Sequence, residues 1–215
     1  MYNKRALIMN HVREHATIYM FMTILFLTGV IFGAIIVNSM NFVQKQDLFF
    51  YLERFFGGIA DGEQIGSHEI WKSSFFYHVK YLLLLFVLGL SVIGLPVVWI
   101  LLFLKGLVVG FSVGFIVNQL GMGSGLLLSS LSIAPQNLLV IPVYIVAGSL
   151  SMLFSLTLLR KLFSRTISQP VLQPLGKYTI VFASLLVISM AAAALEAYVA
   201  NGAMELLIKS LYNSQ

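Results

Sequence analysis

Cysteine is absent from the 215-residue chain, and charged residues make up only 10% of it. The lack of cysteine excludes disulfides, thiolate metal sites and cysteine nucleophiles. A soluble domain carries about 25% charged residues, so this chain has too few polar side chains to cover a surface that faces water. It is instead 59% hydrophobic, with a mean hydropathy of +0.94. The composition indicates an integral membrane protein.

Catalytic and metal-binding patterns are absent as well. The sequence contains no Walker loop, no HExxH and no GxSxG, and no Ser–His or Asp–Asp pair falls within the apolar stretches described below. The four histidines are scattered, without acidic or cysteine companions that would make a convincing metal site. The formal charge of +5 lies at the ends of expected helices rather than along one face. We therefore expect no enzyme activity, no cofactor, no metal and no nucleic-acid partner.

Long apolar stretches recur along the chain, and about twenty such residues suffice for a helix to cross a bilayer. The expected spans are Ile18–Val37, His78–Leu104, Gly106–Leu120, Leu138–Leu159 and Thr179–Ala200. Gly94 and Pro96 interrupt the second stretch, which is either one kinked, tilted helix or a helix that breaks at the proline. The first reading is favoured, with Lys105 at its cytoplasmic end.

These stretches predict an all-α, polytopic helix bundle of about five spans that forms one membrane domain over residues 1–215. Runs of this length favour helices over the alternating strands of a β-barrel. One further segment, Leu126–Ile133, is apolar but too short to cross, and Pro135 stops it. It is a candidate re-entrant half helix.

The long polar segment 38–77 is expected to form an extracytoplasmic loop. Apolar residues within it recur at helical spacing, which predicts an amphipathic helix in the membrane interface. The residues on this face are Leu48, Tyr51, Leu52, Phe55 and Phe56. The helix either rests on lipid or presents a surface to a partner outside the membrane, and both interpretations are open.

Small residues at every fourth position let helix backbones approach closely. Gly29 and Gly33 form such a pair in the first span, and Gly106, Gly110 and Gly114 form a longer row. The row needs a close partner helix, which lies either in this chain or in a second copy, as in a homo-oligomer.

Lysine and arginine mark the cytoplasmic side of a membrane protein. With the N-terminus inside, eight of the thirteen fall on the cytoplasmic side: Lys4, Arg5, Arg13, Lys105, Arg160, Lys161, Arg165 and Lys177. The other five fall outside: Lys45, Arg54, Lys72, Lys80 and Lys209. The connector 160–177 is basic and contains no acid, which is the strongest local signal. Five spans then place the C-terminus outside.

Glu196 is the acid placed well inside an apolar run. The expected topology brings Asn118, Gln119, Gln136 and Asn137 to the same outer level. Intramembrane carboxylates are costly and usually face protein or water. The cluster is either a docking or conduction site, or a set of amides that cap helix ends and satisfy one glutamate.

Several of these features together resemble one family. They are the five spans in this order, Lys105-Gly106 with the glycine row, Ala134-Pro135-Gln136-Asn137, and the ending Ala194-Leu195-Glu196-Ala197-Tyr198-Val199. This pattern resembles the stage II sporulation protein M family of endospore-forming bacteria over nearly the whole chain. The broader family opens its fourth helix with Pro-His-Gly and an acid three residues later. Here Gln136, Asn137 and Val140 stand at those positions, whereas Glu196 matches the acid of the last helix.

The resemblance implies a role in engulfment, in the mother-cell and septal membrane. It implies a non-enzymatic scaffold that anchors a peptidoglycan-degrading complex with stage II sporulation proteins D and P. A transporter or channel subunit is the second functional class. The segment Leu126–Ile133, the glycine row and Glu196 motivate it, but the inner halves of the expected spans hold almost no ionisable group.

Overall fold

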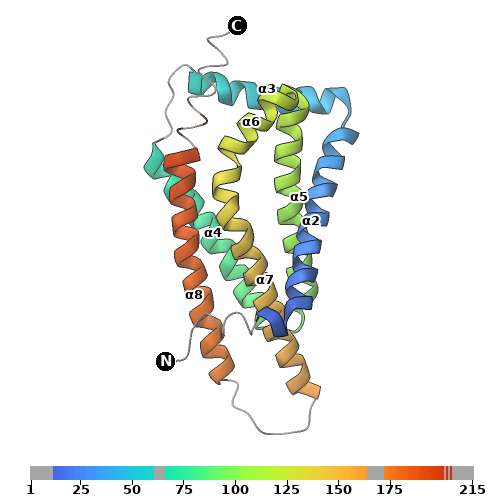
Figure 1. Ribbon diagram of the computed structural model, residues 1–215, viewed down its shortest axis with the longest axis vertical. Helices are drawn as coiled ribbons and strands as arrows, with labels where there is room; N and C mark the ends of the chain where they lie inside the picture. Colours follow the sequence, from blue (N-terminus) through green and yellow to red (C-terminus); the bar gives the residue numbers. More distant parts are fainter. Residues whose placement is uncertain (1–11, 61–65, 164–171, 201, 203, 205–215) are drawn as a thin grey trace.

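The computed structural model describes residues 12–60, 66–163, 172–200, 202 and 204. The elements in this part of the chain are all helical: α2 (Ala16–Ser39), α3 (Phe42–Ala60), α4 (Ser67–Gly89), α5 (Gly94–Leu120), α6 (Met122–Ser132), α7 (Ala134–Phe163), α8 (Leu172–Leu195) and the π-helix η1 (Glu196–Ala200). Five long helices, α2, α4, α5, α7 and α8, form a bundle, and α3 lies across one end of it (Figure 1). We call this the α3 end.

The expected all-α membrane bundle is confirmed. Within the described residues, four helices are long and apolar enough to cross a membrane: Ala16–Ser39, Gly94–Leu120, Ala134–Phe163 and Pro174–Ala200. The expected spans 18–37, 138–159 and 179–200 lie within three of them. Helix α4 packs against α7 and α8 as a fifth member of the bundle. It carries Glu69, Lys72 and Lys80, which lower its hydropathy.

The expected helix 78–104 and the short span 106–120 are wrong. The chain turns at residues 90–93, and Gly94–Leu120 is one helix with Lys105 near its middle. A side chain at Gly94 would collide with the backbone of Leu88, so the turn is tight because this residue is glycine. Pro96 lies in the first turn of α5, where a missing N–H costs no helical hydrogen bond.

Two expected loops are partly helical. Helix α4 begins at Ser67, so the segment 38–77 contains all of α3 and the first turns of α4. Helix α7 extends to Phe163 and α8 begins at Leu172, so only residues 164–171 of the expected connector 160–177 lie outside the described part. The segment Leu126–Ile133 forms most of α6. This helix folds back along α5 after Gly121, which adopts a φ of 80°, and Gly125 lies against Val117.

Helices α2 and α5 form the most extensive helix pair, and glycines make it possible. A Cβ at Gly29 would meet the carbonyl oxygen of Phe103, and one at Gly33 would meet that of Leu107. From the other side, a Cβ at Gly106 or Gly110 would meet the backbone of α2, at Phe26 and Val30 respectively.

The residue numbers in these contacts rise together, so the two helices are parallel. Gly114 continues the row at 3.3 Å from the Cα atom of Ala34. The glycine row therefore finds its partner helix within this chain.

The core lies between the five long helices. An aromatic group fills the part of the core between the second half of α7 and the beginning of α8: the ring of Tyr178 lies 4.6 Å from Phe154 and 4.7 Å from Phe182, between centroids. Large apolar side chains remain exposed around the outside of the bundle. They include Ile24, Ile31, Val87, Ile100, Val108, Ile180 and Val187. A bundle that is apolar inside and outside suits lipid as its solvent.

Candidate functional site

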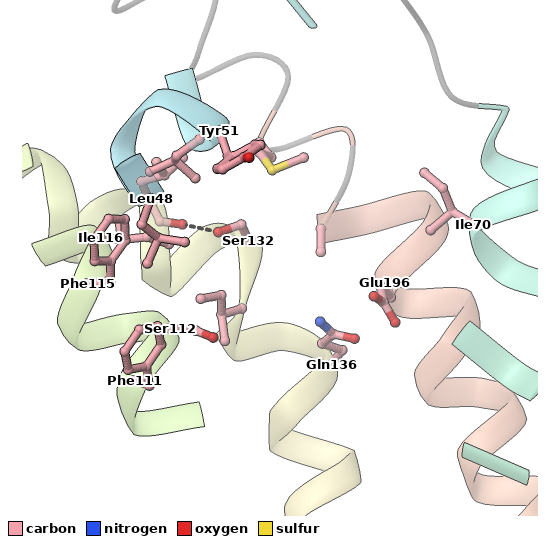
Figure 2. A pocket seen from close by; sticks show the side chains of 15 residues that line it. Leu48, Tyr51, Ile70, Phe111, Ser112, Phe115, Ile116, Ser132, Gln136 and Glu196 are labelled. Atoms are coloured by element: carbon pink, nitrogen blue, oxygen red, sulfur yellow. Dashed lines mark hydrogen bonds between the residues drawn. The ribbon is translucent and has the colours of Figure 1, made fainter. Parts of the chain in front are cut away.

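Glu196 directly follows the last residue of α8 and begins η1, and its carboxylate contacts residues of α4 and α7. Ser74 of α4 donates a hydrogen bond from Oγ to Glu196 Oε2. Gln136, in the first turn of α7, faces the same carboxylate (Figure 2). With its amide nitrogen turned toward the acid, Gln136 donates to both carboxylate oxygens, at 3.1 Å from Oε1. Three helical segments thus meet at one acid, whose described hydrogen-bond donors are neutral groups.

A buried histidine continues this network into the bundle. His78 lies one turn after Ser74 on α4, with 4% of its surface exposed. Its Nε2 lies 3.3 Å from Ser74 Oγ, and its Nδ1 lies 2.6 Å from the hydroxyl oxygen of Tyr144 on α7. Glu196, Ser74, His78 and Tyr144 therefore form one chain of hydrogen-bonded side chains across three helices.

The Ser74–His78 contact is a pair that the sequence analysis did not find, because Ser74 fell in the expected loop. Its geometry does not match a hydrolytic triad. In a triad the acid holds the histidine and the histidine receives the serine proton. Here the acid accepts from Ser74 itself, and His78 is held by a tyrosine hydroxyl. The arrangement is that of a buried polar network.

Lys105 lies near the middle of α5, and its ammonium lies close to three tyrosine rings. The Nζ atom lies 4.7 Å from the ring centroid of Tyr77, 5.2 Å from Tyr144 and 5.9 Å from Tyr81. It also donates to the Tyr77 hydroxyl at 3.5 Å. Cation–π contacts within about 6 Å partly replace the hydration that a lysine loses in such a place. The expectation that Lys105 marks a cytoplasmic helix end is wrong.

Two cavities adjoin Glu196. The first has a volume of about 580 Å³ and is mainly apolar (Figure 2). The second, of about 650 Å³, lies between α4, α5 and α7 and is lined by polar residues of the network together with Lys105. Ile70, Ser112, Ile133, Gln136 and Glu196 line both cavities. Only the second reaches Glu69, His78, Lys105 and Asn137.

The structure separates the polar residues that the sequence analysis grouped. Glu196 and Gln136 are in contact, and Asn137 lines the second cavity while its side-chain amide donates to the Ile133 carbonyl at 2.8 Å. Asn118 and Gln119 lie in the last turn of α5 and line neither cavity. Helix α6 folds back beside that turn, and of these four amide side chains only Gln136 has a described contact with the acid.

The amphipathic face of α3 covers the first cavity. Leu48, Tyr51 and Leu52 line it, and Leu52 packs with Leu128 of α6. Phe55 and Phe56 belong to α3, but their side chains lie outside the described part. Other apolar residues of α3 point away from the bundle: Phe42, Val43 and Phe50 are 60–78% exposed.

The sequence analysis missed Ser74, His78, Lys105 and Tyr144 as members of the site. One signal was present in the sequence. Ser74, Tyr77, His78 and Tyr81 recur at i, i+3, i+4 and i+7, so polar side chains share one face of α4. Helix α4 in turn directs that face at Lys105 and Tyr144. In the described part of the chain, no group of histidines and acids is arranged to hold a metal ion.

Comparison with known proteins gives one match. The family model of stage II sporulation protein M matches residues 22–201. This range runs from within α2 to the end of η1 and contains every residue that lines the two cavities except Met204. No curated protein and no solved structure gives a significant match.

Proposed function

The chain belongs to the stage II sporulation protein M family, and we propose that it is a membrane scaffold for engulfment of the forespore. In this role it anchors peptidoglycan hydrolases, stage II sporulation proteins D and P, at the mother-cell and septal membrane. The chain itself performs no hydrolysis, in keeping with the order of contacts among Glu196, Ser74 and His78.

The observation that carries this proposal is the position of α3. The helix lies across the end of the bundle rather than within it (Figure 1). Phe50 and Tyr51 are exposed side by side on it, with ring centroids 6.2 Å apart. Exposed aromatic side chains are enriched among the residues that dominate protein–protein binding. We assign this aromatic pair to contact with the hydrolases.

The scaffold requires the α3 end to lie outside the cell membrane. The long helices α2, α4, α5, α7 and α8 alternate in direction, so the beginning of α2 and the end of α8 lie at opposite ends of the bundle. The proposed orientation has the beginning of α2 on the cytoplasmic side and the end of α8 outside. Arg160 and Lys161 lie at the opposite end of α7, in keeping with the positive-inside rule. Lys80 and Lys105 lie within helices of the bundle, so neither residue indicates a side of the membrane. Without them, the remaining lysines and arginines are still more numerous on the proposed cytoplasmic side.

Capture of partners from sporulating cells tests the scaffold. The double variant Phe50→Ser, Tyr51→Ser should lose stage II sporulation proteins D and P from the tagged chain, while its amount in the membrane is unchanged. Phe163→Ser is the matched control, because this side chain is 81% exposed at the opposite end of the bundle. Undiminished capture by the double variant would exclude α3 as the docking surface.

A transporter or channel subunit is the second candidate, and one observation favours it. The cavity that holds Lys105, His78 and Glu196 places ionisable groups deep in the bundle, where the sequence analysis expected almost none. Glu196→Gln separates the two functions. A scaffold keeps its partners after this change if packing survives, whereas a carrier that moves charge through the site loses flux across proteoliposome membranes.

A further inference from the structure

Charged residues of both signs line one cavity, and among the described residues no contact pairs Lys105 with Glu196 or Glu69. Lys105 and Glu196 both face the 650 Å³ cavity. Among the described residues, the contacts of the ammonium are to tyrosines, and the carboxylate accepts from a serine and an amide. Unpaired charges are costly inside a membrane protein, and they mark binding sites more often than they serve packing.

The cation side of the cavity is open to an anion. Tyrosine rings hold Lys105 by their faces and leave ammonium protons free, because Tyr77 accepts only one. Tyr77 of α4 and Val108 of α5 line the cavity and are 52% and 53% exposed. The cavity is therefore partly open to the outside of the bundle between these two helices. A phosphate or carboxylate entering there would find a preformed ammonium.

The acid side is open to an ammonium. Glu196 accepts from Ser74 and Gln136, which orient its oxygens, and a carboxylate has acceptor sites beyond these bonds. Glu69 and Asn137 also line this cavity. A primary ammonium has three N–H donors and can donate to the carboxylate oxygens of this cavity. A trimethylammonium has no N–H donor and cannot form these hydrogen bonds.

We propose that this cavity binds a zwitterion with a primary ammonium and a phosphate or carboxylate. The anionic group lies at Lys105, and the ammonium lies at Glu196 with Glu69 beside it. This is the chemistry of an ethanolamine phospholipid headgroup and also of a small free zwitterion such as O-phosphoethanolamine. In the lipid case the exposed apolar side chains around the bundle contact the acyl chains, while the headgroup occupies the cavity. The site does not depend on the hydrolase role proposed above.

Native mass spectrometry of the purified full-length chain tests the lipid source. Ethanolamine, choline and glycerol phospholipids with the same acyl chains compete in equal amounts. The ethanolamine lipid should be retained about tenfold more than either of the others, the ratio expected for one charge-assisted contact. Equal retention of all three would mean that lipids bind only nonspecifically around the bundle.

Calorimetry with soluble probes tests the free zwitterion on the unmodified chain. O-phosphoethanolamine should bind and displace the ethanolamine lipid, whereas ethanolamine and glycerol 3-phosphate, each with one of the two charges, should bind about tenfold more weakly. Binding of O-phosphoethanolamine without any lipid preference assigns the site to a free solute. Failure of both O-phosphoethanolamine and the ethanolamine lipid to bind selectively overturns the proposal.

Charge variants locate the site. Lys105→Met and Glu196→Gln should each weaken ethanolamine-lipid retention about tenfold, and Glu196→Gln should raise the share of the anionic glycerol lipid. Lys80→Met is the control, because Lys80 is exposed on α4 and lines neither cavity. Lys105→Arg keeps the charge should the methionine variant fail to fold. Unchanged selectivity in both Lys105→Met and Glu196→Gln would place the ligand elsewhere and overturn the assignment.

Discussion

His78 and Tyr144 lie 66 positions apart in the chain and are joined by a hydrogen bond of 2.6 Å between Nδ1 and the phenol oxygen. Both residues are nearly inaccessible, at 4% and 0% exposure. This contact ties α4 to α7 and connects the Glu196 network to the aromatic surroundings of Lys105, since the Tyr144 ring is also one of those that face the ammonium.

Removing the Tyr144 hydroxyl should destabilise the bundle. Tyr144→Phe leaves His78 without its second partner in a buried place, which costs about 1–2 kcal/mol of unfolding free energy. Denaturation in mixed micelles measures the change. Tyr51→Phe is the control, because this hydroxyl belongs to a side chain that is 69% exposed, and the change should stay within about 0.5 kcal/mol. Equal losses in both variants would contradict a structural role for the His78 contact.

Alanine at the α2–α5 contact should separate the two helices. Gly110→Ala places a methyl group against the backbone of Val30, which cannot move aside as a flexible side chain would. We expect a loss of about 1–3 kcal/mol, as for overpacking of a tight core.

Gly176→Ala is the opposite case and serves as the control. Gly176 lies in α8 with no heavy atom within 4 Å of a Cβ placed there. Alanine should stabilise the helix by about 0.5–1 kcal/mol. Thermal unfolding of the two variants in the same detergent compares them, and a Gly110→Ala variant as stable as the native chain would contradict the close parallel contact.

Two buried serines of α7 should respond differently to alanine. Ser155 donates to the Ser91 carbonyl at 2.7 Å and so closes the α4–α5 turn onto α7. Ser149 is equally buried, and its hydroxyl has no partner among the described residues. Ser155→Ala should cost about 0.6–1.7 kcal/mol, whereas Ser149→Ala should be neutral or stabilising. Denaturation curves that shift by the same amount would show that hydrogen bonding does not distinguish them.

The absence of cysteine makes the proposed sidedness directly measurable. A single cysteine in place of Tyr51 should react with a membrane-impermeant maleimide added to intact protoplasts, because the proposed orientation puts α3 outside. A single cysteine in place of Phe163 should react only after permeabilisation. Both side chains are well exposed, so reactivity reports the side of the membrane rather than burial. The reverse pattern would invert the topology.

Periodicity and length predicted most of the fold because lipid leaves few alternatives to helices. The stretch 78–104 was misread for a physical reason. Lys105 has the appearance of a helix end, since a lysine inside a span is costly. The cost is met by Tyr77, Tyr81 and Tyr144, and two of these three lie on α4, whose first half looked too polar for a span. Local sequence cannot show that a distant helix supplies the compensation.

The sequence also predicted the candidate site only in part. Counting passes brought Gln136 to the level of Glu196, and the two residues do lie together. Counting also brought Asn118 there, although α6 folds back and leaves that residue outside both cavities. Depth along a helix follows from residue number. Direction around the helix axis depends on packing, which the sequence did not reveal.

The parallel contact of α2 and α5 has a consequence for biosynthesis. The chain is made from its N-terminus, so α2 emerges with Gly29 and Gly33 uncovered and must wait until α3 and α4 have been translated before α5 arrives. During that interval its smooth side is the natural contact for a chaperone or insertase, and the order of translation thereby sets a moment at which the nascent helix needs protection.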